Sequence, residues 1–277
     1  MHYRIFATKI EENLVFVVND NEKIDFCDIF FSPIQVDYPL DESYKESIQH
    51  YVQAAIALSH ISGTCIYIFD YVENKFVYFS EKERMMCGYS VDEINSMGVY
   101  FFEKILHPDD MMSFELINKI RYDFIYNHID PSERHYYWTT CDLRIVTKSG
   151  KTRLQNYRFL PFLNDSKGNV ILEMAQIDIS TREKSGNYEI YSIKENKFLK
   201  YDDRKKCFAP VKHKFLSSME KEVLLLTSKG FTIKEVANKM SIEVFTVNYY
   251  TKSILNKLNV SNMKEAVFLY GQRGDLL

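Results

Sequence analysis

The alternation of apolar and polar residues changes along the chain and divides it into segments. Near the N-terminus, residues 3–8 and 14–18 are short β-rich runs on either side of a polar stretch, a pattern that predicts a hairpin. Residues 41–60 carry apolar side chains at helical spacing, which predicts a helix. We therefore assign residues 1–47 to an N-terminal extension with short strands and the start of a helix.

Longer β-rich runs follow between residues 64 and 180. Runs at 64–70 and 75–80 come first, and a helical and polar stretch comes after them. Three further runs lie at 136–147, 151–163 and 169–179. Two strands, a helical insertion and three meandering strands indicate one antiparallel sheet with helices on one face. The expected fold class is therefore α+β, with this domain at residues 48–184.

Residues 185–210 connect this domain to the end of the chain. The runs at 188–193 and 197–201 are β-rich and lie around polar residues, as in a hairpin. Their texture is similar to that of the first hairpin, and the sequence leaves open whether the two pair with each other. We treat 185–210 as a connector.

Short amphipathic patterns joined by tight turns fill residues 211–277. Ser217 or Ser218 is placed to cap a first helix, and Gly230 to end it in the left-handed conformation. Thr232 and Glu235 form a T-x-x-E capping box at the start of a second helix. A small all-α domain is expected, with Ser241 in the turn before a third helix.

The third helix, from about residue 243 to 258, has two different faces. Val247 and Ile254 recur at helical spacing and are expected to face the core. The opposite face carries Asn248, Tyr249, Lys252 and Asn256. Asn can hydrogen-bond an adenine edge, Lys can reach guanine or phosphate, and Tyr offers an apolar ring with a polar tip. This face is typical of a helix that enters the major groove of DNA.

The distribution of charge along the chain gives modest support to DNA as the partner. Residues 210–277 hold 10 Lys and Arg against 6 Asp and Glu, a balance of +4, whereas residues 1–209 hold 25 against 32, a balance of −7. A basic balance where the helical pattern lies is what a domain that binds a polyanion needs.

Other classes of function find little support in the sequence. The 5 Cys form no CxxC pair, which argues against a disulfide framework and a zinc site. There is no Walker loop, GxSxG or HExxH motif, so we expect no enzyme and predict no cofactor. Without a signal-peptide pattern or a long apolar run, we expect a cytoplasmic protein that does not contact the membrane.

The C-terminal stretch resembles the LuxR/FixJ-type, or GerE-type, helix-turn-helix domain over nearly all of residues 215–267. The matching positions are Leu216, Ser217, Glu220, Glu222, Val223, Leu224, Gly230, Thr232, Lys234, Glu235, Ala237, Thr246, Val247, Ile254, Lys257, Leu258 and Val260. The resemblance implies that the groove-facing residues are Thr246, Asn248, Tyr249 and Lys252. It also implies that Thr232 and Lys234 lie near the phosphate backbone. Lys257 fits a phosphate contact and a solvated surface lysine equally well.

Four positions depart from the pattern of that family. Met219 and Met263 stand where the family usually has Arg, Asn248 where it has Lys, and Tyr250 where it has His. Fewer phosphate-binding cations should lower affinity and flatten its salt dependence. An interaction module whose helix-turn-helix has weak or lost DNA affinity is therefore the alternative.

The preceding domain resembles a PAS domain. The resemblance rests on three fragments in the right order, which are residues 87–94, 105–110 and 178–180. The helix start around His107 and Pro108 has an ordinary structural interpretation, a capped first turn with acids at the positive end of the dipole. Since PAS-like domains often hold a small molecule, a candidate ligand pocket consists of Tyr67, Phe69, Phe76, Tyr78, Met85, Met86 and Trp138. These side chains fit a packed core as well.

Together these patterns predict a bacterial-type transcription regulator. Its PAS-like domain would sense a signal or mediate dimerisation and would control the C-terminal helix-turn-helix. The expected partners are double-stranded DNA and a second copy of the chain, with RNA polymerase or another regulator as a further candidate.

Overall fold

The computed structural model divides the chain into two compact units, residues 1–210 and 211–277, which we describe separately. The structure describes residues 6–10, 13–17, 42–82, 85–165, 167–180, 182–195, 197–202, 204–205, 207–210, 216–258 and 260–272.

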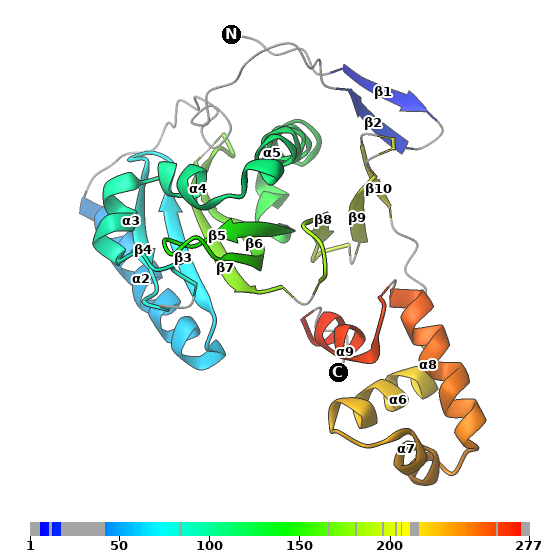
Figure 1. Cartoon of the computed structure of the whole chain (residues 1–277). Coiled ribbons are helices and arrows are strands. Elements are labelled where there is room, and N and C mark those ends of the chain that lie inside the picture. The colour runs from blue at the N-terminus through cyan, green and yellow to red at the C-terminus, as the bar shows by residue number, and fades with distance from the viewer. Residues whose placement is uncertain are drawn as a thin grey trace. The chain divides into compact units, whose positions relative to one another are not determined.

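An eight-stranded antiparallel sheet forms the centre of the first unit (Figure 1). Its strands are β3 (Cys65–Asp70), β4 (Lys75–Phe79), β5 (Tyr137–Val146), β6 (Thr152–Asn164), β7 (Val170–Ile179), β8 (Gly186–Ser192), β9 (Lys197–Asp202) and β10 (Cys207–Pro210). They are ordered β10-β9-β8-β5-β6-β7-β3-β4. The five strands β3–β7 are adjacent in this sheet. Between β4 and β5 the chain forms the helical insertion. This is the order predicted for a PAS-like domain, so the expected α+β fold class is confirmed.

Helices cover both faces of this PAS-like part of the sheet, so the expectation of helices on one face was wrong. α2 (Glu42–Ser62) lies on one face, and α3 (Val91–Met97), α4 (Tyr100–Ile105) and α5 (Pro108–His128) lie on the other (Figure 1). Because side chains alternate along a strand, Tyr67 and Phe69 of β3 join the core under α3 and α4, whereas Ile66 and Ile68 join the core under α2. A 3-10 turn, η1 (Pro131–Tyr136), leads from α5 into β5.

The start of α5 has the structural role that its sequence predicted. His107 is the N-cap, and its ring nitrogen accepts a hydrogen bond from the Asp109 N–H. The Asp110 carboxylate accepts hydrogen bonds from the Arg144 side chain at 2.5 Å and the Arg144 N–H at 2.8 Å, which ties the helix to β5. These bonds explain the acidic pair without a catalytic role.

Residues 185–210 differ from the predicted connector. β8 pairs with β5, from Tyr137↔Ser192 to Thr140↔Glu189, and β9 and β10 extend the same sheet. A satellite apolar core under α5, which includes Ile120, Phe124 and Phe208, holds these added strands in place. The segment therefore belongs to the first unit, and β10 was not expected from the sequence because it has only four residues.

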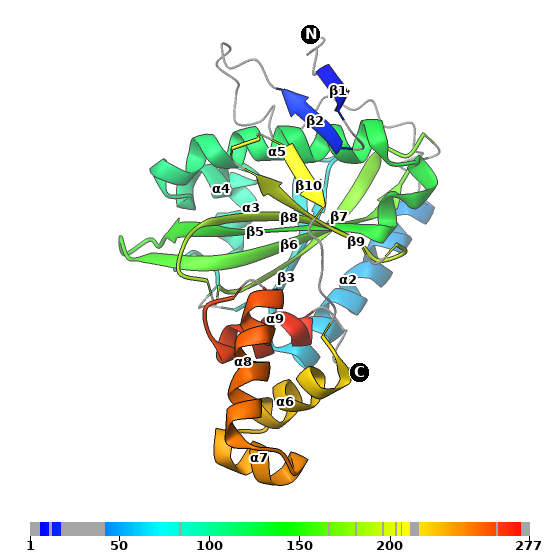
Figure 2. The ribbon, with the colours of Figure 1, turned by 90° about the vertical axis from the view of Figure 1, so that its right-hand side faces the viewer.

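The N-terminal hairpin is present as β1 (Phe6–Ile10) and β2 (Asn13–Val17), which pair with each other. These two strands form a two-stranded sheet of their own, and β2 lies beside β10 (Figure 2). The two predicted hairpins are therefore in different sheets. The outer ends of the predicted strands at 3–8 and 14–18 lie partly outside the described residues.

The described cysteines, Cys65, Cys87, Cys141 and Cys207, are buried free thiols. Within the described ranges, no group of three or more His, Cys, Asp or Glu side chains could hold a metal ion. None of the helices described here combines the length and the apolar character needed to cross a membrane.

Candidate nucleic-acid interface

Two capping boxes fix the first helices of the second unit, α6 (Ser218–Ser228) and α7 (Ile233–Met240). The Ser217 side chain accepts a hydrogen bond from the Glu220 N–H, and the Glu220 carboxylate accepts one from the Ser217 N–H at 2.6 Å. Thr232 and Glu235 repeat this exchange at the start of α7. Both motifs satisfy backbone N–H groups that a helix start leaves unpaired.

The turn after α7 sets the direction of the next helix. Ser241 has a φ of 54° in the left-handed region, and the Ile242 N–H donates to the Ala237 carbonyl at 3.0 Å. Gly230, with a φ of 86°, ends the preceding helix as predicted. The turn predicted at Asn259 lies outside the described residues.

The helices α8 (Val244–Leu258) and α9 (Met263–Gln272) complete a core with α6 and α7. Its most buried side chains, each at most 2% exposed, are Val223, Leu224, Val236, Ala237, Val247, Ile254 and Ala266. Ala237 has the small side chain that lets α7 approach its neighbours closely. The apolar stripe predicted for the third helix is therefore the buried face of α8. The opposite face of α8 is exposed to solvent.

A buried carboxylate joins α6 to α8. The side chain of Glu220, 4% exposed, accepts hydrogen bonds from Ser253 Oγ and Lys257 Nζ, both at 2.6 Å. Burial by itself would raise the pKa of Glu220, but the hydrogen bonds from Lys257, Ser253 and Ser217 outweigh it and lower the pKa to about 2. Lys257 is thus tied to Glu220 and is not a solvated surface lysine; its side chain serves the scaffold.

The Glu220 anchor should make the stability of this unit depend on pH. Folding lowers the pKa of Glu220 from 4.5 to about 2. The ionised carboxylate therefore stabilises the fold fully above pH 4.5, and this stabilisation is lost as the pH falls through about 2. Glu220→Gln should therefore cost about 3 kcal/mol near pH 6 and almost nothing near pH 2. Urea unfolding followed by the methyl NMR signals of Val223 and Ile254 would measure the difference. The matched control is Glu222→Gln, on the exposed side of α6; an equal, pH-independent cost for both variants would contradict the anchor.

The outward face of α8 presents the side chains that the sequence predicted for a groove. Asn248, Tyr249 and Lys252 are all exposed, and Tyr249 is 63% exposed. Position 252 lies about one helical turn after positions 248 and 249, so the three side chains share a face. The first turn of α8 contains no acidic residue that would repel a phosphate.

The remaining predicted contacts are less open. Thr246 is half-buried, and its N–H donates to the Glu243 carbonyl. The Thr232 hydroxyl donates to the Glu235 carboxylate at 2.7 Å, so it is engaged within the cap. Lys234 is exposed in the first turn of α7. The structure thus brings Asn248, Tyr249 and Lys252 together on α8, whereas Thr232 and Lys234 belong to the start of α7.

Phe245 was not among the predicted site residues. It is 81% exposed at the start of α8, one turn before Tyr249. The sequence could have identified Phe245 as a site residue, because it lies outside the apolar stripe of Val247 and Ile254. An aromatic ring at that position does not fit into the core. Phe245 and Tyr249 give the outward face two adjacent aromatic rings.

The candidate ligand-pocket residues of the PAS-like domain are divided between different places. Tyr67, Phe69, Phe76 and Met86 are buried in the core under α3 and α4, with Met85 packed against it. Tyr78 packs in the core under α2, on the other side of the sheet. Trp138 packs on Tyr191 of β8, with ring centroids 5.2 Å apart. The seven side chains therefore do not face one common space, because the sheet separates them.

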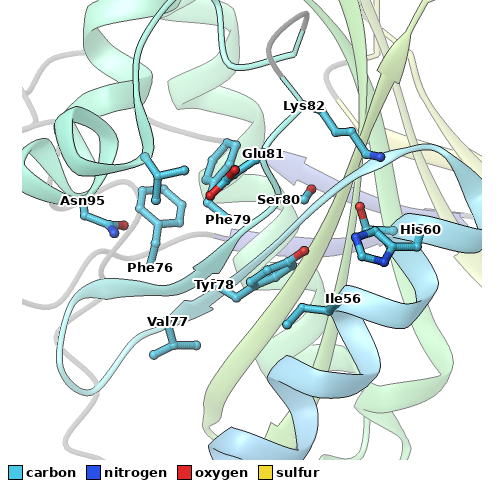
Figure 3. Close-up of a pocket in the computed structure, with 12 residues that line it drawn as sticks. Ile56, His60, Phe76, Val77, Tyr78, Phe79, Ser80, Glu81, Lys82 and Asn95 are labelled. Atoms are coloured by element: carbon cyan, nitrogen blue, oxygen red, sulfur yellow. The ribbon is translucent and has the colours of Figure 1, made fainter.

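A surface groove of about 420 Å³ lies along β4, which is at one edge of the sheet (Figure 3). Ile56 and His60 of α2 and Tyr78 of β4 form part of it, and Lys82 lies near its rim. The buried Ser80 hydroxyl at this groove is already paired with the backbone of Ile66, donating at 2.9 Å and accepting at 2.6 Å. Among the described residues that line this groove, none has a buried side-chain polar atom without a hydrogen-bond partner.

Comparison with known proteins gives a family for the second unit. Residues 214–270 match the family model described as GerE, bacterial regulatory proteins of the luxR family. The transcriptional regulatory protein DesR of Bacillus subtilis (strain 168) is 42% identical over 59 residues, which are 21% of this chain and 30% of DesR. The chain thus spans less than a third of the curated relative that it matches.

The solved structures found by comparison are more distant in sequence. The Vibrio cholerae VqmA dimer, solved in the absence of its target DNA, is 17% identical with a TM-score of 0.29, over 76% of this chain and 83% of VqmA. A sensory box histidine kinase/response regulator from Burkholderia thailandensis is 20% identical with a TM-score of 0.32. The match covers 46% of this chain and 84% of that chain. At these TM-scores neither likeness defines the function of this chain.

The fold and the outward face of α8 define a helix-turn-helix protein with a PAS-like domain. Its C-terminal domain is a LuxR-type helix-turn-helix domain, which confirms the family that the sequence predicted.

Proposed function

We propose that this protein is a transcription regulator that binds double-stranded DNA through α8. The observation that carries the proposal is the outward face of that helix, where Asn248, Tyr249 and Lys252 are exposed side by side on a scaffold of the LuxR type. Asn and Lys supply the hydrogen bonds that distinguish bases in the major groove, and aromatic rings contact thymine methyl groups. Lys234, at the exposed start of α7, is suited to a phosphate.

A single helix reads only a few base pairs, so we infer that the protein acts as a homodimer. Two copies of α8, spaced about one DNA turn apart, would read a two-fold symmetric site. The PAS-like domain is the part of the chain available to pair the copies or to sense a signal, and such a signal would act by shifting the arrangement of the helices. RNA polymerase or another regulator would be the protein partner at the promoter, inside the cytoplasm.

Selection of bound duplexes from a random library tests the proposal. The full chain should enrich one sequence family, and the Asn248→Ala/Lys252→Ala variant should lose that enrichment. Lys104→Ala removes a charge from an exposed position of α4 in the first unit and should leave the enrichment intact. No enrichment by the wild-type protein, or the same enrichment by the double variant, would rule out sequence reading by this face.

One alternative has an observation in its favour. Met219 and Ile233 are 38% and 45% exposed, so part of this unit's surface is apolar where a DNA-binding surface is usually basic. A protein-interaction module with weak or lost DNA affinity would show such a surface. In that case nonspecific binding to duplex DNA would be weak at low salt and nearly independent of salt, whereas several phosphate contacts give a steep dependence.

The exposed ring of Phe245 should contribute to base preference. If it contacts a thymine methyl group, Phe245→Ser should weaken binding to the selected duplex by roughly 10-fold or less and relax the preference for thymine at one position. The fold should be unaffected, because the ring is outside the core. Repeating the selection with this variant measures the effect, and an unchanged sequence preference at every position would show that the ring reads no base.

A further inference from the structure

An apolar ring stands near the centre of the outward face of α8. Phe245 is the second residue of this helix and is 81% exposed. Two positions along a helix are about 200° apart around its axis, so Phe245 lies almost opposite Val247, which is 1% exposed. Phe245 is also not a member of the core that α6, α7, α8 and α9 share. Its ring is therefore available to whatever this face binds.

Tyr249 extends this apolar centre by one helical turn. It is 63% exposed, and side chains four positions apart are neighbours on a helix. The Tyr249 ring meets the ring of Tyr250 edge to face, with centroids 5.8 Å apart and an interplanar angle of 64°. Tyr250 itself packs against the core of the unit, so this contact limits the orientations of Tyr249. We call Phe245 and Tyr249 the aromatic pair.

The aromatic pair lies where a recognition helix contacts base edges. In helix-turn-helix proteins the N-terminal residues of that helix reach into the major groove, and Phe245 is in the first turn of α8. A phenyl ring has no hydrogen-bond donor or acceptor. The major-groove edges of guanine, adenine and cytosine present donors and acceptors, whereas thymine adds a methyl group at C5. Burial against a C5 methyl group is thus the favourable contact that Phe245 can make with a base edge.

The polar neighbours of the aromatic pair fit the same kind of site. Helical spacing places Asn248 and Lys252 on one side of Phe245 and Tyr249 on the other. An A·T pair presents the adenine N6 and N7 atoms beside the thymine methyl group in the major groove. Asn248 and Phe245 therefore match two neighbouring features of the same class of base pair.

We propose that the aromatic pair recognises the C5 methyl group of a pyrimidine, so that α8 binds a site more tightly when a cytosine at that position is methylated at C5. Such a cytosine presents its methyl group at the same place in the groove as thymine does. Methylation of cytosine would then regulate binding at sites where cytosine replaces thymine. The inference rests on the proposed function, because it concerns the same face of α8.

Removal of single methyl groups from the DNA tests the inference without changing the protein. Each thymine of the selected duplex is replaced in turn by uracil, which lacks only the methyl group, and the Kd of the full chain is measured by fluorescence anisotropy. Uracil should weaken binding about 4-fold at one position or more, the effect expected for one buried methyl group. With cytosine and guanine paired at such a position, 5-methylcytosine should bind at least about 4-fold more tightly than cytosine.

Two protein variants assign the effect to the rings. Phe245→Ser or Tyr249→Ser, whichever removes the contacting ring, should bind the thymine and uracil duplexes equally. Tyr100→Ser is the control, because Tyr100 is an exposed ring of α4 in the first unit. This variant should keep the wild-type ratio of the two Kd values.

Either of two results would overturn the inference and leave the proposed function in place. One is specific binding whose Kd changes less than about 2-fold with uracil at every thymine. The other is a preference for thymine over uracil that persists in the Phe245→Ser/Tyr249→Ser double variant, since the methyl group would then act through DNA shape or another side chain. A chain that selects no duplex at all would reject the proposed function, and the inference with it.

Discussion

Arg121→Met should lower the free energy of unfolding of the first unit by about 3–5 kcal/mol, because it leaves a buried carboxylate without its counter-ion. Glu173 is 6% exposed, and besides the ion pair with Arg121 it accepts a hydrogen bond from the Tyr71 hydroxyl at 3.0 Å. Burial raises the pKa of Glu173, and the nearby Arg121 opposes that rise. Without the arginine, the carboxyl must take up a proton or stay charged in an apolar core.

The paired substitution distinguishes the ion pair from simple packing. Arg121→Met combined with Glu173→Leu removes both charges and should recover most of the lost stability, since apolar replacement of a whole buried pair is often nearly neutral. Urea unfolding followed by Trp138 fluorescence reports on this unit alone, because Trp138 is the single tryptophan and lies on β5. A double variant as unstable as the sum of the two single variants would show that the charges do not depend on each other.

Asn248→Ala should weaken binding to the selected DNA duplex by roughly 10- to 100-fold and relax the preference at one base position. The reason is that an Asn amide can make a bidentate contact to adenine that alanine cannot replace. Fluorescence anisotropy with the selected duplex and with single-base variants of it measures both effects. Its side chain is exposed, so the fold should be unchanged.

Lys252→Ala provides the comparison within the same face. If Lys252 binds phosphate, its loss weakens all duplexes about equally and lowers the salt slope by about one unit, without changing the base preference. Equal behaviour of the Asn248 and Lys252 variants, each leaving the preference intact, would mean that α8 holds the backbone and reads no bases.

The helical unit followed from its sequence because local signals determine it. The capping boxes at Ser217 and Thr232 and the left-handed Gly230 are decided by residues within a few positions of one another. Contacts across the fold could not be predicted in this way. The pairing of Lys257 with Glu220 joins residues 37 positions apart, and no pattern within α8 indicates it.

The PAS-like sheet followed from its alternating runs, but the content of its interior did not. β3 and β4 lose their regular register between Ile68 and Phe69, and Tyr78 lies on the opposite side of the sheet from Phe76. A simple count of aromatic positions therefore grouped side chains that the sheet separates. The buried ion pair of Arg121 and Glu173 was missed because a charged residue within a long helix usually indicates a solvated face. Only the fold shows that Arg121 is buried.

The central claim, that α8 reads a DNA sequence, is tested most directly by comparing two duplexes of equal length. One carries the selected site and the other carries the same bases in shuffled order, and the Kd of the full chain is measured for both at physiological salt. A specific regulator should bind the selected duplex at least about 10³-fold more tightly. Equal affinity for the two duplexes would contradict the claim and would leave this domain as a nonspecific binder or a protein-interaction module.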